Sequence, residues 1–338
     1  MIRRALARIA LALFALASAG CDLVQPSAST APPGAVQASP TPQPTARVGS
    51  ADRPLVMASL PSRDAARVTA SLKAITAGIE KATGLRWDVK VPTSYADTIE
   101  GLCSGQLDVA WLSPLAAVTA QSKNCSDPLL GSLRDDPIAA RASVTYPLQV
   151  LARTGAGISS LKDLKGKKVA LADRPAAPSA LSFMAQIKKD IGEDPKTFFS
   201  QTVYVSDDEK AVLAVYQGQV DAAVSVVDAR DRVERTFPDV KQRTARVATV
   251  GPVPNDGVSV RKTLPADVRD QIAKALIDQS KTDEGKTALK ALYGIDGLDR
   301  IDPRAYDPLI EAARIMAIDL DREAAATARP LPSPTRAP

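Results

Sequence analysis

Short apolar runs alternate with amphipathic stretches along most of this chain, and this alternation constrains the fold more than any other feature. Residues 55–60 form a short apolar run ended by a proline, which is typical of a strand. Residues 64–83 then carry apolar side chains at three- to four-residue steps, which is typical of a helix. The same alternation returns after residue 143. Repeated strand–helix–strand units favour mostly parallel sheets with helices on both faces, so the predicted fold class is α/β.

One turn occurs twice in this pattern. Residues 103–110 and 215–223 share the core Gly-Gln-x-Asp-x-Ala, which lies between the end of a predicted helix and the start of a predicted strand. The duplication indicates two lobes of one architecture, although a helix–Gly–strand turn is common enough to recur by coincidence. After the second copy we expect one strand over residues 247–260, followed by helical stretches over residues 265–280, 284–293 and 303–320.

The composition narrows the function classes. The chain of 338 residues is long enough for two lobes, and it contains no histidine. Without histidine there is no Ser-His-Asp or Cys-His pair and no histidine metal ligand, so we expect neither an enzyme nor a bound metal or cofactor. The formal net charge is +5, but Arg3, Arg4 and Arg8 contribute much of it. The nearly neutral remainder lacks the clustered positive charge that binds nucleic acid, so we expect no nucleic-acid partner.

The N-terminus has the pattern of an export signal. Three arginines precede an apolar run over residues 9–19, which is shorter than the roughly 20 residues that span a bilayer. Residues 18–21 read Ser-Ala-Gly-Cys, and small residues before a cysteine resemble the lipobox of bacterial lipoproteins. The resemblance implies a signal peptide over residues 1–20 and acylation of Cys21. The alternative is an ordinary secretory peptide cleaved at small residues, with Cys21 as a bystander.

Proline-rich segments flank the central part of the chain. Residues 21–52 combine many prolines with Ser, Thr, Ala and Gln, and prolines also recur over residues 326–338. Such segments bury too little apolar surface to offset the entropy lost on ordering, so we expect a disordered tether and a disordered tail. Together with the lipid anchor, the tether predicts a protein held at the cell membrane on its extracytoplasmic side, in the periplasm or on the outer face.

Export also changes how the two remaining cysteines are interpreted. Thiols outside the cytosol tend to oxidise, and Cys103 and Cys125 flank one predicted strand–helix unit. A disulfide between them would hold that helix in place. The alternative is two free thiols, buried or exposed.

Four segments carry a resemblance to a known family. Residues 95–97 read Tyr-Ala-Asp, residues 105–114 read Gly-Gln-Leu-Asp-Val-Ala-Trp-Leu-Ser-Pro, residues 160–170 read Ser-Leu-Lys-Asp-Leu-Lys-Gly-Lys-Lys-Val-Ala, and residues 253–260 read Val-Pro-Asn-Asp-Gly-Val-Ser-Val. Over residues 53–318, their order and spacing resemble the solute-binding lipoproteins of phosphonate, phosphite or phosphate ABC importers. These proteins are a branch of the type II periplasmic binding proteins.

The resemblance implies two α/β lobes joined by two hinge crossovers, with a ligand enclosed between them. The first lobe would take residues 53–145 and 247–325, and the second lobe would take residues 146–246. It further implies a monomeric receptor, anchored in the membrane by lipid, that captures a small polar anion and passes it to an ABC permease. The other hypothesis is a binding-protein fold retired from transport, which acts as a sensor or as an interaction protein of the envelope.

The sheet pattern predicts where the ligand would bind. In open parallel sheets, ligands bind beyond the carboxyl ends of the strands, where helix N-termini offer N–H groups and partial positive charge to an anion. The candidate ligand-binding residues lie in such turns and crossovers: Ser62, Arg63, Tyr95, Ser113, Tyr146, Arg174, Ser179, Asp228, Asn255 and Asp256.

These candidates also have purely structural explanations. Ser113 and Asp228 could cap helices, although as a ligand contact Asp228 would recognise a cationic group. Tyr95 and Tyr146 could serve only in packing, and residues 255–256 form a turn signal in their own right after a proline. The two candidate arginines could pair with an anion or face solvent.

The turn before the predicted second-lobe helix departs from the family pattern. Phosphonate-binding members usually carry a run of Ser and Thr there, whereas residues 177–180 read Ala-Pro-Ser-Ala. The proline also removes one N–H donor. Each lost donor costs about 1–3 kcal/mol when its partner oxygen stays buried and unpaired. This turn therefore weakens the case for a phosphonate ligand but not the case for the scaffold.

Overall fold

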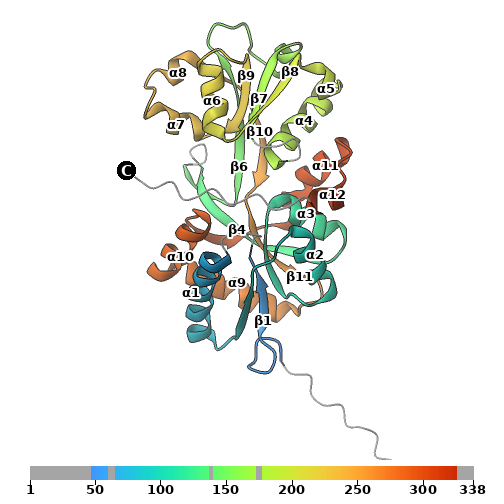
Figure 1. Cartoon of the computed structure of the whole chain (residues 1–338), viewed down its shortest axis with the longest axis vertical. Helices are drawn as coiled ribbons and strands as arrows, with labels where there is room; N and C mark the ends of the chain where they lie inside the picture. The colour runs from blue at the N-terminus through green and yellow to red at the C-terminus, as the bar shows by residue number, and fades with distance from the viewer. Residues whose placement is uncertain (1–46, 60–64, 137–139, 173–176, 326–338) are drawn as a thin grey trace, which may run out of the picture. The chain divides into compact units, whose positions relative to one another are not determined.

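The computed structural model describes residues 47–59, 65–136, 140–172 and 177–325, which form two β-sheets with helices on both faces (Figure 1). The predicted α/β class is therefore confirmed. The predicted signal peptide, the predicted lipidation site Cys21, most of the predicted tether and the predicted tail lie outside the described residues. In the part of the chain that is described, no helix has both the length and the apolar character needed to span a membrane.

The first sheet has the strand order β12-β4-β11-β3-β1-β2, and β5 pairs with β4. Its strands are β1 (Leu55–Ala58), β2 (Trp87–Lys90), β3 (Val109–Leu112), β4 (Ser126–Asp136), β5 (Arg141–Ser143), β11 (Gly257–Arg261) and β12 (Gly297–Arg300). One face is covered by α1 (Ala65–Thr83), α9 (Ala266–Lys281) and α10 (Asp283–Tyr293). The other face is covered by α2 (Tyr95–Ser104), α3 (Pro114–Ser122), α11 (Asp307–Ile315) and α12 (Leu320–Ala325), with η2 (Pro303–Tyr306) leading into α11.

The second sheet has the strand order β10-β6-β9-β7-β8. Its strands are β6 (Thr145–Arg153), β7 (Lys168–Ala172), β8 (Gln201–Val205), β9 (Ala222–Val226) and β10 (Thr244–Pro254). Figure 1 shows α6 (Asp208–Tyr216), α7 (Ala229–Glu234) and α8 (Val240–Arg243) on one side of it. On the opposite side lie α4 (Pro178–Ile191) and α5 (Pro195–Phe198), with η1 (Leu161–Leu164) packed into the same apolar cluster.

Each sheet contains a strand that arrives from the other sheet and runs antiparallel to both of its neighbours. β11 is antiparallel to both β3 and β4, and β6 is antiparallel to both β9 and β10. Parallel pairing is confined to β1 with β2 and β3, and to β7 with β8 and β9. The sheets are therefore mixed, which corrects the expectation of mostly parallel sheets. The reason is topological: β6 and β11 arrive from the other sheet at the edge where the parallel strands end, so they must run the opposite way.

The chain crosses between the sheets twice, before β6 and before β11. β10 stays in the second sheet up to Pro254, and β11 begins in the first sheet at Gly257. The prediction of one strand over residues 247–260 is therefore wrong, and the return crossover lies later than the lobe boundary that we expected at residue 246. The apolar pattern continues across the break, whereas the backbone turns at Asn255 and Asp256 after a proline that cannot donate an N–H bond.

The duplicated turn has the same structure in both sheets. The Asp108 carboxylate accepts a hydrogen bond from Val56 N of β1 at 3.0 Å, and the Asp221 carboxylate accepts one from Lys168 N of β7 at 2.8 Å. The backbone N–H of each aspartate also donates to the carbonyl of the same partner residue. These matched bonds fix β3 beside β1 and β9 beside β7, so the repeat reflects two sheets of one architecture rather than coincidence.

The cysteines that flank β3 and α3 are joined. The structure places Cys103, near the end of α2, in a disulfide with Cys125, just before β4, and their Cα atoms are 4.5 Å apart. The bond ties α2 to the first sheet near the amino ends of β3 and β4.

Candidate functional site

Both crossovers lie beside the carboxyl ends of parallel strands. Leu148 near the start of β6 pairs with Val226, the last residue of β9. Gly257 at the start of β11 pairs with Leu112, the last residue of β3. The turns that follow β3 and β9 therefore lie next to the two crossovers, as ligand-binding turns of open α/β sheets do.

Tyr146 and Ser179 form the centre of the candidate site. Tyr146 lies in the first crossover, at the start of β6, and Ser179 lies in the first turn of α4. Their hydroxyl oxygens are 3.2 Å apart. Burial raises the pKa of Tyr146, and the charges of Asp208 and Asp256 raise it further, so this hydroxyl stays protonated and can donate. The structure thus brings together two of the predicted ligand residues.

The second crossover contributes a carboxyl group to the same site. Asp256 lies between β10 and β11, and burial raises its pKa, whereas the nearby Arg134 lowers it. The Tyr306 side chain is 1% exposed, and burial together with the charge of Asp256 raises its pKa. Arg134 itself donates from its guanidinium to the carbonyl of Tyr293 at 3.2 Å. The charge of Asp256 therefore acts on the hydroxyl groups of Tyr146 and Tyr306, and Arg134 offsets part of it.

Asn255 has a structural role at this crossover. Its Nδ2 donates to the carbonyls of Ser132 at 2.9 Å and Ser143 at 3.0 Å, and its backbone N–H donates to Val144 at 2.9 Å. The side chain is 3% exposed. Its amide hydrogens are used to bind the two crossovers together, while ligand contact by this residue remains a prediction.

The turn after β9 is held by two polar side chains from other elements. The Asp208 carboxylate at the start of α6 accepts a hydrogen bond from Val226 N at 2.9 Å. Gln149 of β6 is fully buried, and its Nε2 donates to the carbonyls of Val226 at 3.0 Å and Val227 at 3.1 Å. Asp228 begins α7, and its carboxylate pairs with Arg232 rather than capping the helix.

Ser113 and Tyr95 lie at the starts of first-sheet helices. Ser113 caps α3, and its Oγ accepts a hydrogen bond from Ala116 N at 3.4 Å. Tyr95 is the first residue of α2 and packs, partly buried, against the apolar clusters on both faces of the sheet. Contact of either residue with a ligand remains a prediction. Ser62, Arg63 and Arg174 lie outside the described residues.

Three residues near this site were not predicted from the sequence: Arg134, Asp208 and Tyr306. Asp208 carried a usable signal, since it follows the helix cap Asp207 directly after a predicted strand. Arg134 lies in β4 and Tyr306 ends a short 3₁₀ turn, and no local pattern marks either. Only the crossover geometry brings them near Asp256.

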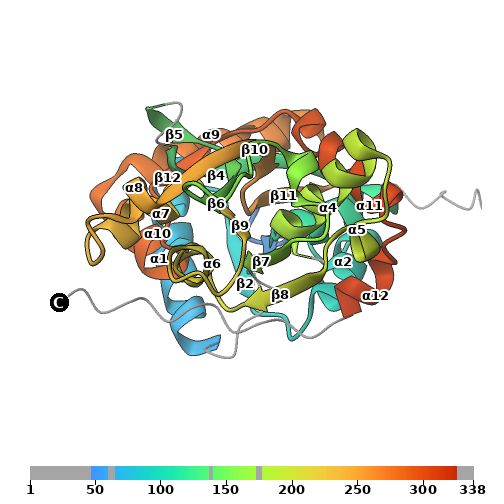
Figure 2. The same cartoon turned by 90° about the horizontal axis from the view of Figure 1, so that it is seen from above.

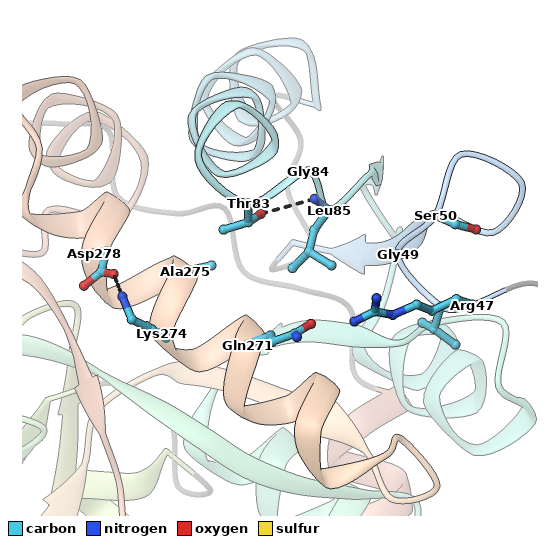
Figure 3. Close-up of a pocket in the computed structure, with 11 residues that line it drawn as sticks. Arg47, Gly49, Ser50, Thr83, Gly84, Leu85, Gln271, Lys274, Ala275 and Asp278 are labelled. Atoms are coloured by element: carbon cyan, nitrogen blue, oxygen red, sulfur yellow. Dashed lines mark hydrogen bonds and ion pairs between the residues drawn. The ribbon is translucent and has the colours of Figure 1, made fainter.

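A separate cavity of about 520 Å³ lies at the other end of the first sheet (Figure 3). It is lined by residues 47–50, by the turn over residues 83–85 that joins α1 to β2, and by α9 side chains such as Gln271. Because that turn leads into the amino end of β2, the cavity lies away from the carboxyl ends of the strands. None of the predicted ligand residues that the structure describes lines it.

Comparison with known families gives one match over most of the chain. The model for "ABC transporter, phosphonate, periplasmic substrate-binding protein" matches residues 57–306. The chain is 26% identical over 221 residues to the phosphonates-binding periplasmic protein of Escherichia coli (strain K12), covering 63% of this chain and 62% of that protein. It is 26% identical over 169 residues to the phosphate-import protein PhnD of Mycolicibacterium smegmatis, covering 48% of this chain and 52% of that protein. The chain thus spans less than two thirds of the length of either relative.

Two solved structures illustrate the shared fold. XAC2383 from Xanthomonas citri, bound to chloride ion, aligns with a TM-score of 0.58 at 19% identity, covering 78% of this chain and 98% of that one. PhnD1 from Prochlorococcus marinus, in complex with methylphosphonate, aligns with a TM-score of 0.51 at 13% identity, covering 78% of this chain and 98% of that one. At these identities the likeness shows the fold.

Proposed function

The chain belongs to the periplasmic substrate-binding proteins of phosphonate ABC transporters, and from this we propose that it is the extracytoplasmic receptor of an ABC importer. It captures a small polar anion of the phosphonate, phosphite or phosphate class between its two lobes. The family's members bind and transport a substrate without transforming it, and the site found here holds hydroxyl, carboxyl and guanidinium groups suited to recognition. Closure of the lobes on the ligand is a ligand-biased shift between open and closed states.

The observation that carries this proposal is the pairing of Tyr146 with Ser179 at the first turn of α4. The first N–H groups of a helix have no acceptor within the helix, and the helix dipole makes this end partly positive. Two hydroxyl groups 3.2 Å apart at such an end supply directional donors to an oxyanion. Tyr146 comes from the first crossover, so a ligand bound here contacts the hinge directly.

We also propose that Cys21 carries a lipid and that the proline-rich segment tethers the receptor to the membrane. The Ser-Ala-Gly-Cys sequence after an apolar run supports this. The partner is then an ABC permease in the same membrane, and the receptor acts as a monomer. Mass spectrometry of protein taken from its native membrane tests the anchor, because acylation adds the mass of the lipid to the peptide that begins at Cys21.

Thermal unfolding with a panel of ligands tests the proposed activity. Phosphate, phosphite, methylphosphonate, methanesulfonate and nucleobase precursors are added at millimolar concentration at pH 6 and pH 8. A ligand present at 100 times its Kd stabilises the folded state by about 2.7 kcal/mol, which gives a clear rise in Tm. We expect one class of tetrahedral anions to raise the Tm. A panel in which no compound changes the Tm contradicts the transport function.

The depleted turn over residues 177–180 supports a second candidate function. Ala177 begins α4 without a side-chain cap, and Pro178 has no N–H, so this helix end offers fewer donors than a Ser- and Thr-rich turn would. A binding protein with a weakened anion site would suit a sensor or an interaction protein of the envelope. Capture of partners from solubilised membranes separates the two functions, since a receptor for import recovers a permease and a sensor recovers a kinase or scaffold.

A further inference from the structure

Three acidic side chains lie near the carboxyl end of β9. Asp208 and Glu209 are in the first turn of α6, and Asp228 begins α7. Arg232 neutralises two of them, because its Nε donates to Glu209 Oε1 at 2.8 Å and its guanidinium also bonds the Asp228 carboxylate. In the described part of the chain, no lysine or arginine forms an ion pair with Asp208.

Asp208 is held in place by its hydrogen bond to the turn that follows β9. Its Oδ1 accepts the 2.9 Å bond from Val226 N, and Gln149 holds the carbonyls of Val226 and Val227 from the other side. Burial raises the pKa of Asp208, while Arg232 lowers it and the neighbouring carboxylates Asp228 and Asp207 raise it further. A carboxylate held in this way cannot turn toward solvent to escape repulsion from a bound anion.

Asp208 lies next to the strand that carries Tyr146, because Val226, whose N–H it accepts, pairs with Leu148 of β6, and Tyr146 precedes Leu148 in that strand. Asp208 is the first among the charged neighbours that raise the pKa of Tyr146, and the Tyr146 hydroxyl lies 3.2 Å from Ser179 Oγ at the start of α4. Asp256 adds further negative charge, and Arg134 offsets part of it. The donors that would hold a doubly charged anion at this helix end are few, because residues 177–180 offer one hydroxyl group.

We propose that Asp208 is a specificity-determining residue, which makes the site prefer singly charged tetrahedral anions to doubly charged ones. Repulsion from a fixed carboxylate is twice as large for two charges as for one, whereas the number of hydroxyl donors is the same for both anions. The inference rests on the proposed function and deepens it by naming the charge class of the ligand.

Calorimetric titration with two anions of the same shape tests the proposal. Methanesulfonate carries one charge, and methylphosphonate carries two at a pH well above its second ionisation. We expect the wild-type protein to bind methanesulfonate more tightly at that pH. Asp208→Asn keeps an oxygen acceptor for Val226 N but removes the charge, so it should shift the ratio of the two affinities toward methylphosphonate by about tenfold.

The neighbouring carboxylate provides a matched control. Asp207 is exposed and caps α6, so Asp207→Asn changes the net charge equally, and the ratio should stay within about twofold of wild type. Asp208→Ser serves as a second uncharged variant if Asp208→Asn does not fold.

A wild-type protein that prefers doubly charged methylphosphonate overturns the proposal. An uncharged variant that lowers the affinity for both anions equally also overturns it, because that is the result of a purely structural role. If wild type binds neither anion nor any compound of the thermal panel, the proposed function itself fails, and the inference fails with it.

Discussion

Asp208 and Asp256 are partly buried carboxyl groups that make the stability of the folded protein depend on pH. Burial raises the pKa of both Asp208 and Asp256, since a charged carboxylate loses solvation that its neighbours replace only in part. The folded state therefore binds these protons more tightly than the unfolded state does. Stability contributed in this way is present at low pH and is lost as the pH rises from the unfolded carboxyl pKa of about 4 through the folded pKa.

The variant Asp256→Asn tests whether the charged form of Asp256 destabilises the folded protein. We expect the variant to have a higher Tm than wild type at pH 7, because the charged form of Asp256 is costly when folded. The difference should shrink toward pH 4, where wild-type Asp256 is protonated. Each 1 kcal/mol corresponds to about 2–4 °C in Tm, within the range of differential scanning calorimetry. The exposed Asp52→Asn is the control. A Tm for Asp256→Asn that is lower than wild type at pH 7 contradicts the assignment.

A variant of Ser179 tests whether the anion binds at the start of α4. Ser179→Ala removes one hydroxyl donor at the start of α4, and a hydrogen bond to a charged group is worth about 1.5–3 kcal/mol. We therefore expect the affinity for methylphosphonate at pH 6 to fall by about tenfold to a hundredfold in calorimetric titration. Ser200→Ala, an exposed change just before β8 at the amino end of that strand, should leave the affinity unchanged. Equal affinities for wild type and Ser179→Ala would place the ligand elsewhere.

At the scale of elements, the sequence predicted the strands and helices well where periodicity is strong. The buried stripe of α1, which includes Val68, Leu72 and Ile79, follows the predicted helical spacing. The two copies of the Gly-Gln-x-Asp-x-Ala turn predicted the equivalence of the sheets. The change of sheet at residues 255–256 was missed, because β10 and β11 are both apolar and local pattern does not record which sheet a strand joins. For the same reason, Arg134 and Tyr306 could not be assigned to the site.

The disulfide is an element-scale bond with a measurable effect. It links residues 22 positions apart, and a loop of this size restricts the unfolded chain by about 3 kcal/mol. We expect the double variant Cys103→Ser with Cys125→Ser to lose about that much stability in urea denaturation. Methylphosphonate affinity should change less than twofold, since the bond lies near the amino ends of β3 and β4. A large loss of affinity in the double variant would show that the bond also shapes the site.

At the scale of the whole molecule, the sheets are linked by packing as well as by the two crossovers. Leu181 and Ala185 of α4 belong to the apolar cluster that contains α11, while Phe183 and Ile187 of the same helix face their own sheet. Figures 1 and 2 both show α11 beside α4, and Lys188 Nζ donates to the carbonyl of Ile315 at 3.1 Å. The helix that carries Ser179 is thus held from both lobes.

Paired cavity variants separate these two faces of α4. Leu181→Ala and Ile187→Ala each remove a buried apolar side chain, and each should cost about 2–5 kcal/mol of stability. We expect only Leu181→Ala to loosen the contact between the lobes, and so to increase the radius of gyration of the ligand-free protein in small-angle X-ray scattering. Indistinguishable scattering from the two variants would mean that the α4–α11 contact does not restrain the lobes.

A co-crystal structure with methylphosphonate at pH 6 tests the central claim most directly. We expect electron density for the anion at the first turn of α4, with its oxygens within hydrogen-bond distance of Ser179 Oγ and Tyr146 Oη. Density in the cavity beside α9, or no bound anion at saturating concentration, would contradict it.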